Sequence, residues 1–182
     1  PHHITGVLGI VRTYATRVGE GPFPTEMVDA EEDMANLIRQ RGNEYGSVTK
    51  RPRRCGWFDA VATRYAAELN GFDSVALTKL DVLDALEEIK VCIGYEIDGR
   101  RVDTFPAVSS ELVKIKPVYE TLPGWMCDTV GTTDFDKLPE KARDYVEFLS
   151  AQIGVEIGLI STGPERDQTI ILKESVMEGW FQ

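Results

Sequence analysis

The sequence predicts an α/β fold with a mixed, largely parallel sheet, flanking helices and an inserted antiparallel hairpin region. Short β-branched segments alternate with amphipathic helical patterns, as in folds whose parallel strands are joined by helices. An Asp-Gly pair at 98–99 separates two strand-like segments and is a typical hairpin signal. With 182 residues, 42% hydrophobic and 27% charged, the chain can bury one soluble core. We expect residues 1–182 to be part of a single domain, with a hairpin-rich subregion at about 89–125.

The first third of the chain predicts a strand, a loop and a helix. Residues 6–18 (GVLGIVRTYATRV) are β-branched and apolar, which favours a strand. Closely spaced Gly and Pro at 19–24 then require a loop. Asp29, with Glu32 three residues later, fits a capping box at the start of a helix that ends at Gly42.

A second helix and a buried strand are expected next. Apolar residues recur at helical spacing over 58–69, and Asn-Gly at 70–71 ends the pattern. Residues 74–77 (SVAL) predict a short buried strand, which runs directly into the polar segment 78–81 (TKLD).

The rest of the chain predicts the hairpin region, a helix and two closing strands. The middle third has strand patterns at 89–97, 101–105 and 117–122. A helix starts after Pro139 and ends at Gly154, since Pro suits a first helical turn and Gly a helix end. The last two strands are expected at 156–160 and 169–172.

Composition and charge limit the classes of partner. The net charge of −10 argues against nucleic acid or an anionic membrane as partner of the whole surface. No apolar run approaches the roughly 20 residues of a membrane span, and no secretory signal pattern is present. Cys55, Cys92 and Cys127 are widely spaced, which favours reduced thiols in a cytoplasmic protein over disulfides or a zinc site. His2 and His3 lack partners at metal-ligand spacing.

The segment Thr78-Lys79-Leu80-Asp81 follows a predicted strand, where ligands bind in open α/β sheets. The Asp81 carboxylate can accept hydrogen bonds from the N1–H and N2–H2 edge of guanine, donors that adenine lacks. The stem of Lys79 can lie along the flat base while its ammonium stays solvated. The pattern resembles the N/T-K-x-D element of GTP-binding proteins, although four residues alone are a weak signal and a Lys and an Asp in a loop are usually just solvated.

A basic segment, 50–54 (KRPRR), interrupts the acidic sequence. Arginine binds carboxylates and phosphates through two parallel hydrogen bonds, and Gly46, Ser47 and Thr49 can add backbone amides and hydroxyls. These residues indicate a small anionic ligand. A flexible basic surface loop remains the alternative, and a nucleic-acid-binding loop is disfavoured because no other basic face accompanies it.

Two further loops contain polar or glycine-rich sequence. Ser161-Thr162-Gly163-Pro164 follows a predicted strand and can bind a base or ribose through hydroxyl and backbone groups. On local sequence alone, an ordinary strand-ending turn is the favoured explanation. The segment 16–26 (TRVGEGPFPTE) is too particular for a generic turn, but its ligand is not apparent. The chain contains no G-x-x-x-x-G-K-[ST] phosphate-binding loop.

Taken together, five segments resemble the C-terminal half of the adenylosuccinate synthetase family. They are 10–26 (IVRTYATRVGEGPFPTE), 44–57 (EYGSVTKRPRRCGW), 77–84 (LTKLDVLD), 117–125 (PVYETLPGW) and 160–164 (ISTGP). The resemblance implies a fragment of a larger, P-loop-related nucleotide-binding domain. It also implies a Mg²⁺-dependent, homodimeric ligase of purine biosynthesis that joins IMP and L-aspartate, using GTP, to give adenylosuccinate, GDP and phosphate.

The resemblance further implies ligand-binding roles. GTP would be bound by Arg53, Lys79, Leu80, Asp81, Ser161, Thr162 and Gly163. The aspartate and substrate loop would contain Ser47, Val48, Thr49, Lys50, Arg51, Pro52 and Arg53. IMP would contact Arg51 and the backbone of Val18. No catalytic residue or Mg²⁺ ligand is expected here, because the family's phosphate loop, general-base Asp and acid His lie in its N-terminal half. We therefore expect this chain alone to be inactive.

Two positions in the substrate loop depart from the family pattern. Val48 stands where members often have Thr, and so loses a hydroxyl. Lys50 stands where members usually have Gly, which adopts a positive φ more readily than Lys does. These changes leave the details of aspartate binding open. The alternative functions are a GTP-binding regulatory module without ligase activity and a non-catalytic interaction domain that uses the basic loop.

Overall fold

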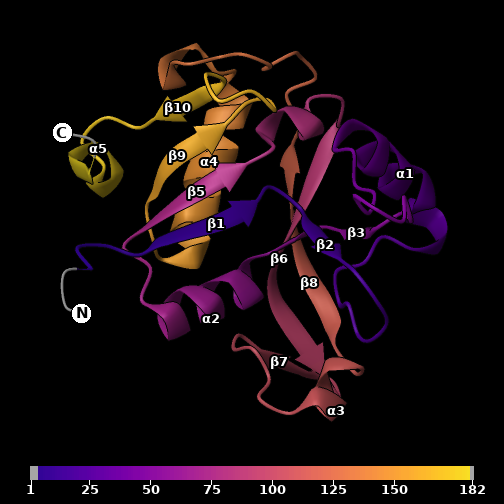
Figure 1. Ribbon diagram of the computed structural model, residues 1–182. Coiled ribbons are helices and arrows are strands. Elements are labelled where there is room, and N and C mark those ends of the chain that lie inside the picture. Colours follow the sequence, from indigo (N-terminus) through magenta and orange to yellow (C-terminus); the bar gives the residue numbers. More distant parts are fainter. Residues whose placement is uncertain (1–3, 181–182) are drawn as a thin grey trace.

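Figure 1 shows a computed structural model, which describes residues 4–180. Within these residues the architecture is α/β, and the strands form three sheets rather than one. The main sheet contains, in spatial order, β1 (Leu8–Arg12), β5 (Ser74–Thr78), β9 (Ile157–Ser161) and β10 (Thr169–Ile171). β1, β5 and β9 are parallel, and β10 is antiparallel to β9. The predicted mixed, largely parallel sheet is confirmed.

The strand predicted at 6–18 is in fact two strands. β1 pairs with β5, whereas β2 (Ala15–Arg17) turns away and pairs with β3 (Arg54–Gly56) in a two-stranded sheet. Thr13 and Tyr14 lie at the break, and both are buried. The Tyr145 hydroxyl donates a hydrogen bond of 2.8 Å to the Thr13 carbonyl, so a distant helix helps to fix the break.

The predicted capping box at Asp29 and Glu32 is wrong. Asp29 has a φ of +52° and begins a short 3-10 turn, η1 (Asp29–Glu31), and α1 (Glu32–Arg41) starts only at Glu32. A residue in the left-handed region does not have the extended backbone of an N-cap. The predicted end of this helix at Gly42 is confirmed.

The two longer helices that flank the main sheet have caps that agree with their sequences. α2 (Ala60–Asn70) starts two residues later than predicted, because Phe58–Asp59 form the short strand β4. The Asp59 side chain accepts a hydrogen bond from the Ala62 amide at 3.0 Å. α2 ends at Gly71 (φ +64°) and α4 (Glu140–Ile153) at Gly154 (φ +73°). Gly stops a helix at such positions because it has no β-carbon to oppose a positive φ.

The hairpin region forms a sheet of its own. Its strands are β4, β6 (Glu88–Ile97), β7 (Arg100–Val102) and β8 (Lys116–Pro123). The turn at Asp98 and Gly99 has positive φ at both residues, as an Asp-Gly hairpin turn requires. In Figure 1, β6 and β8 extend away from the main sheet and carry β7 and α3 (Ser109–Leu112) at their far end.

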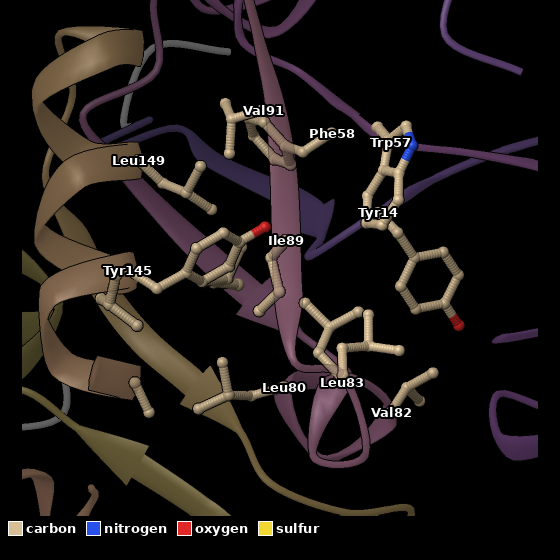
Figure 2. Close-up of a cluster of buried hydrophobic side chains, with 14 of the residues drawn as sticks. Tyr14, Trp57, Phe58, Leu80, Val82, Leu83, Ile89, Val91, Tyr145 and Leu149 are labelled. Carbon is tan, nitrogen blue, oxygen red and sulfur yellow. The ribbon is translucent and has the colours of Figure 1, made fainter. Parts of the chain in front are cut away.

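One hydrophobic core joins the main sheet to the base of the hairpin. Figure 2 shows Tyr145 and Leu149 of α4 directed toward Ile89 of β6. Directly after β5, the 3-10 turn η2 (Leu80–Leu83) buries three apolar residues, Leu80, Val82 and Leu83, in the same core. This burial fixes the turn that contains Asp81.

Smaller elements complete the chain: η3 (Phe135–Lys137) and α5 (Val176–Trp180). Cys55 and Cys92 are buried free thiols, and Cys127 is an exposed free thiol. Across residues 4–180, no helix has both the length and the apolar character needed to cross a membrane.

Candidate functional site

A cleft of about 970 Å³ lies at the carboxyl ends of the parallel strands β1, β5 and β9. This is the edge at which open α/β sheets bind ligands. Its walls are formed by Ile10, Val11, Arg12, Tyr14, Thr16, Arg41, Gly42, Asn43, Thr78, Lys79, Asp81, Val82, Ser161, Gly163 and Pro164. The cleft therefore brings together four residues that the sequence analysis assigned to GTP: Lys79, Asp81, Ser161 and Gly163.

Asp81 is held at this cleft by its backbone. Arg41 of α1 donates hydrogen bonds to the main-chain oxygens of Asp81 (2.8 Å) and Val82 (3.0 Å). These contacts do not occupy the Asp81 carboxylate. Partial burial raises the pKa of that carboxyl and the neighbouring Asp84 adds to the rise, while its own backbone amide and the Arg41 charge oppose it. Asp81 is thus a partly desolvated acceptor. Leu80, by contrast, is fully buried in the core and does not line the cleft, so the structure leaves the predicted GTP contact at Leu80 without an exposed surface.

Lys79 connects the cleft to a buried ion pair. Its φ of +66° places it in the left-handed region, and the Thr13 hydroxyl binds its carbonyl at 2.9 Å. The Lys79 ammonium donates to the Gly42 carbonyl and to Glu44 Oε1, the latter at 2.8 Å. The ammonium is therefore bound to two protein acceptors, while the Lys79 side chain remains 32% exposed. Hydrogen bonds to Gly42 and Glu44 thus fix the position of the Lys79 ammonium.

The sequence analysis did not identify Glu44, which is fully buried beneath the cleft. Its Oε1 accepts from the Tyr14 hydroxyl (2.7 Å) and Lys79, and lies 3.5 Å from Arg12 Nε. Its Oε2 accepts from Arg53 Nη1 at 2.8 Å. Burial by itself would raise the pKa of this carboxyl, but hydrogen bonds from Lys79 and Tyr14 and the nearby positive charges hold it below its usual value. Nothing in the spacing of Glu44 signals this burial.

The segment at the end of β9 has one side that lines the cleft and one side that faces the interior. Ser161 and Gly163 line the cleft, and the Ser161 hydroxyl donates to the Gly163 carbonyl at 3.0 Å. Thr162 is fully buried, and its hydroxyl donates to the Thr132 carbonyl at 2.8 Å. The Thr162 hydroxyl therefore supports the loop from within, whereas its two neighbours face the cleft.

A segment of the chain, 125–132, links the two loops that border the cleft. On one side, the buried Asp84 carboxylate accepts from the Trp125 indole at 2.6 Å and from both the amide and the hydroxyl of Thr129 at 2.8 Å. On the other side, the carbonyl of Thr132 in this segment accepts a hydrogen bond from the Thr162 hydroxyl. The separation of the loops after β5 and β9 is thereby set by hydrogen bonds to a common segment.

The predicted substrate loop lies outside the cleft. Ser47, Val48, Thr49, Lys50, Arg51 and Pro52 are all exposed, and none lines the cleft wall. The loop is closed by hydrogen bonds between Gly46 and Arg51 (2.9 Å) and between Lys50 and Gly46 (3.0 Å). Lys50 has a φ of +53°, the conformation for which Gly is better suited. Arg53, at the base of the loop, is half-buried and forms an ion pair with Glu44, which lies beneath the cleft.

The predicted IMP contacts are also separate from the cleft. Val18 is 78% exposed and stands in the glycine-rich loop after β2, while Arg51 belongs to the exposed substrate loop. The glycine-rich loop is held by Arg54, which pairs with Glu26 through two hydrogen bonds (2.6 and 2.5 Å) and also binds the carbonyls of Gly19 and Gly21. The function of Arg54 in the structure is therefore to order this loop.

The acidic groups near the cleft do not fit a magnesium site. Glu44 is paired with cations, and Asp84 is bonded to Trp125 and Thr129. Among residues 4–180, no group of three or more His, Cys, Asp or Glu side chains is arranged to hold a metal ion. His2 and His3 lie outside the described residues.

Comparison with known proteins identifies the family of the chain. A protein-family model described as adenylosuccinate synthetase matches residues 1–170. The adenylosuccinate synthetase of Solibacter usitatus is 52% identical over 178 residues, which make up 98% of this chain and 40% of that protein. That of Aquifex aeolicus is 53% identical over 167 residues, or 92% of this chain and 38% of that protein.

A solved structure of fully ligated adenylosuccinate synthetase from Plasmodium falciparum has a similar fold. It matches with a TM-score of 0.89 and 38% sequence identity, over 95% of this chain and 42% of that one. The chain spans about two fifths of the length of the curated relatives it matches. On the family match and the identity with these relatives, the chain belongs to the adenylosuccinate synthetase family.

Proposed function

We propose that this chain is the C-terminal part of an adenylosuccinate synthetase and forms the guanine-binding side of its GTP site. The full-length protein would join IMP and L-aspartate, with GTP, to give adenylosuccinate, GDP and phosphate. It would act in the cytoplasm as a homodimer, with Mg²⁺ held by residues outside this chain.

The observation that carries the proposal is the meeting of two predicted guanine-binding segments at one cleft. Lys79 and Asp81 follow β5, Ser161 ends β9 and Gly163 follows it, and all four line the same cleft. A carboxylate selects guanine over adenine because it accepts from two adjacent donors that adenine does not offer. The partial burial of Asp81 strengthens this selection, since water competes less for its oxygens.

The chemistry assigns this chain a binding role. In the proposed reaction, GTP phosphorylates the 6-oxygen of IMP, and the amine of aspartate then displaces that phosphate. The cationic loop 47–53 would bind the aspartate carboxylates, with Thr49 and Arg51 as main contacts, and Arg51 and Val18 would meet IMP. Arg53 would meet GTP as well. The general base and acid would come from the rest of the protein, so we propose that this chain alone does not turn over.

The substitution Asp81→Asn in the full-length protein tests the guanine assignment. Asparagine keeps one acceptor but presents an N–H₂ group to a guanine donor. A charge-assisted hydrogen bond contributes about 1.5–3 kcal/mol, so GTP binding should weaken roughly 10- to 150-fold. ATP binding should change little. Calorimetric titration with both nucleotides measures the preference, and Asp103→Asn, an exposed aspartate in the hairpin region, is the matched control.

Four outcomes would contradict the proposal. An unchanged preference for GTP in Asp81→Asn would remove the role of Asp81. Guanine-selective binding by a full-length protein that forms no adenylosuccinate would indicate a regulatory GTP-binding module instead. Salt-sensitive RNA binding without nucleotide preference would indicate an interaction domain. Adenylosuccinate formation by the purified 182-residue chain would contradict its proposed inactivity.

A further inference from the structure

Glu44 occupies the position where two proposed binding elements meet. Lys79 belongs to the guanine side of the cleft, and Arg53 forms the base of the substrate loop. Both side chains bind the Glu44 carboxylate, at 2.8 Å each. They use different oxygens, Oε1 for Lys79 and Oε2 for Arg53, so the carboxylate can hold both at once.

The position of Glu44 itself is fixed by its backbone. Its amide donates to the Arg39 carbonyl at 2.8 Å, and its carbonyl accepts from the Arg53 amide at 2.9 Å. Its side chain is fully buried, and the Tyr14 hydroxyl donates to Oε1. A carboxylate held in this way presents two acceptors in a constant geometry.

The charge balance around Glu44 requires the carboxylate to be ionised. Arg12, Arg53 and Lys79 all lie within 3.5 Å of its oxygens, so one negative charge faces three positive ones. Removing a buried charge from such a cluster leaves cations that repel one another, and long side chains then move apart toward solvent. The side chains of Lys79 and Arg53, which are only about one-third exposed, would lose their common anchor.

We infer that Glu44 is a positioning residue that couples the guanine side of the GTP site to the substrate loop. Lys79 and Arg53 share this carboxylate, so a change in either one alters the position available to the other. Nucleotide binding at Lys79 would therefore favour the arrangement of Arg53 that the substrate loop needs, and substrate binding would favour Lys79 in return. This inference rests on the proposed function.

The first test is Glu44→Gln in the full-length protein. Glutamine has nearly the same shape but lacks the charge, and its amide nitrogen would face a cation. We expect KM to rise about tenfold or more for both GTP and aspartate, with a smaller change in kcat, because coupling between sites is typically 5- to 150-fold. Glu96→Gln, which removes the charge of an exposed carboxylate 3.9 Å from Lys116, should leave both KM values within about twofold.

The second test begins with a variant that leaves Glu44 unchanged. In Lys79→Met, assayed at saturating GTP, we expect KM for aspartate to rise although Lys79 is not in the substrate loop. In the double variant Lys79→Met/Glu44→Gln, the two effects on KM for aspartate should combine to less than the product of the single effects.

Each result decides between coupling and a merely structural role. A lower Tm for Glu44→Gln with unchanged KM for GTP and aspartate would overturn the inference, and so would a Lys79→Met variant that alters KM for GTP alone. A wild-type full-length protein without ligase activity would instead refute the proposed function, on which the inference depends. Active wild-type protein with unaffected variants would refute the inference only.

Discussion

Replacing Lys50 by Gly should stabilise the protein, because the backbone at this position is strained for any residue with a β-carbon. Lys50 has a φ of +53° and stands at the exposed turn of the substrate loop. Its amide closes the turn by donating to the Gly46 carbonyl at 3.0 Å, so the turn geometry requires this φ. The side chain itself is exposed, and little packing is lost on its removal.

The expected gain follows from two opposing contributions. The left-handed conformation costs an L-residue about 1–2 kcal/mol, and Gly avoids this cost. Gly also makes the unfolded chain more flexible, and this extra conformational entropy lowers the free energy of unfolding by about 0.5–1 kcal/mol. The difference between these two contributions is a net gain for Lys50→Gly of about 0–1.5 kcal/mol in the free energy of unfolding.

Urea denaturation of matched full-length proteins measures this difference. Lys50→Ala is the control, since it removes the charge and the long stem but keeps the β-carbon. We expect Lys50→Gly to be more stable than both Lys50→Ala and the parent protein, with the same m-value. If Lys50→Gly and Lys50→Ala were equally stable, the positive φ would not be a source of strain, and the reasoning would fail.

Two further predictions concern buried carboxylates. The pKa of Glu44 is lowered from the usual value of 4.5, so its ion pairs stabilise the fold above pH 4.5 and lose this effect as the pH falls toward the lowered pKa. In urea titrations, the difference in stability between the parent and Glu44→Gln should therefore shrink below about pH 4.5. Burial raises the pKa of Asp59, so this residue changes the stability with pH in the opposite direction. Because the total stability combines both effects, the quantity to measure is the difference between the parent and Glu44→Gln. Asp84→Asn turns an amide N–H₂ toward the donors of Trp125 or Thr129 and should cost about 1–3 kcal/mol of stability and weaken GTP binding; an unchanged urea midpoint would show that this network is dispensable.

Turns and helix ends were predictable from the sequence because local chemistry determines them. Asp98 and Gly99 form the predicted hairpin turn, and Gly71 and Gly154 end the predicted helices, in each case with a positive φ. The apolar periodicity of α4 was equally reliable, since one face of that helix packs in the core. At these places the local structure is determined by the residues themselves and their neighbours in the sequence.

The break between β1 and β2 could not be predicted, because its cause lies far along the chain. The sequence around Thr13 and Tyr14 is β-branched and aromatic, and by itself favours a continuous strand. The break depends on contacts with Tyr145, Thr78 and Lys79, which no local pattern contains. The start of α1 was mispredicted for a related reason, since only the structure reveals the positive φ of Asp29.

The candidate site was predictable as a set of motifs but not as an arrangement. The motif at Lys79 and Asp81 identified one wall of the cleft, because its position after a buried strand could be read directly. The inward orientation of Thr162 and the burial of Glu44 depend on hydrogen bonds to distant residues, and sequence spacing does not signal either. The proposed roles of the substrate loop and of Val18 stay predictions until ligand binding is measured.

The order of strands in the main sheet has a consequence for how the chain folds. Leu8 pairs with Ser74, and Val75 pairs with Ile157, so the three parallel strands come from the beginning, middle and end of the chain. The hairpin of β6 and β7 joins neighbouring segments and can form locally, whereas the sheet must close long loops first. The edge that lines the cleft is therefore complete only after β9 (Ile157–Ser161) has paired with the distant β5 (Ser74–Thr78), so the ligand-binding surface forms later than the local hairpin.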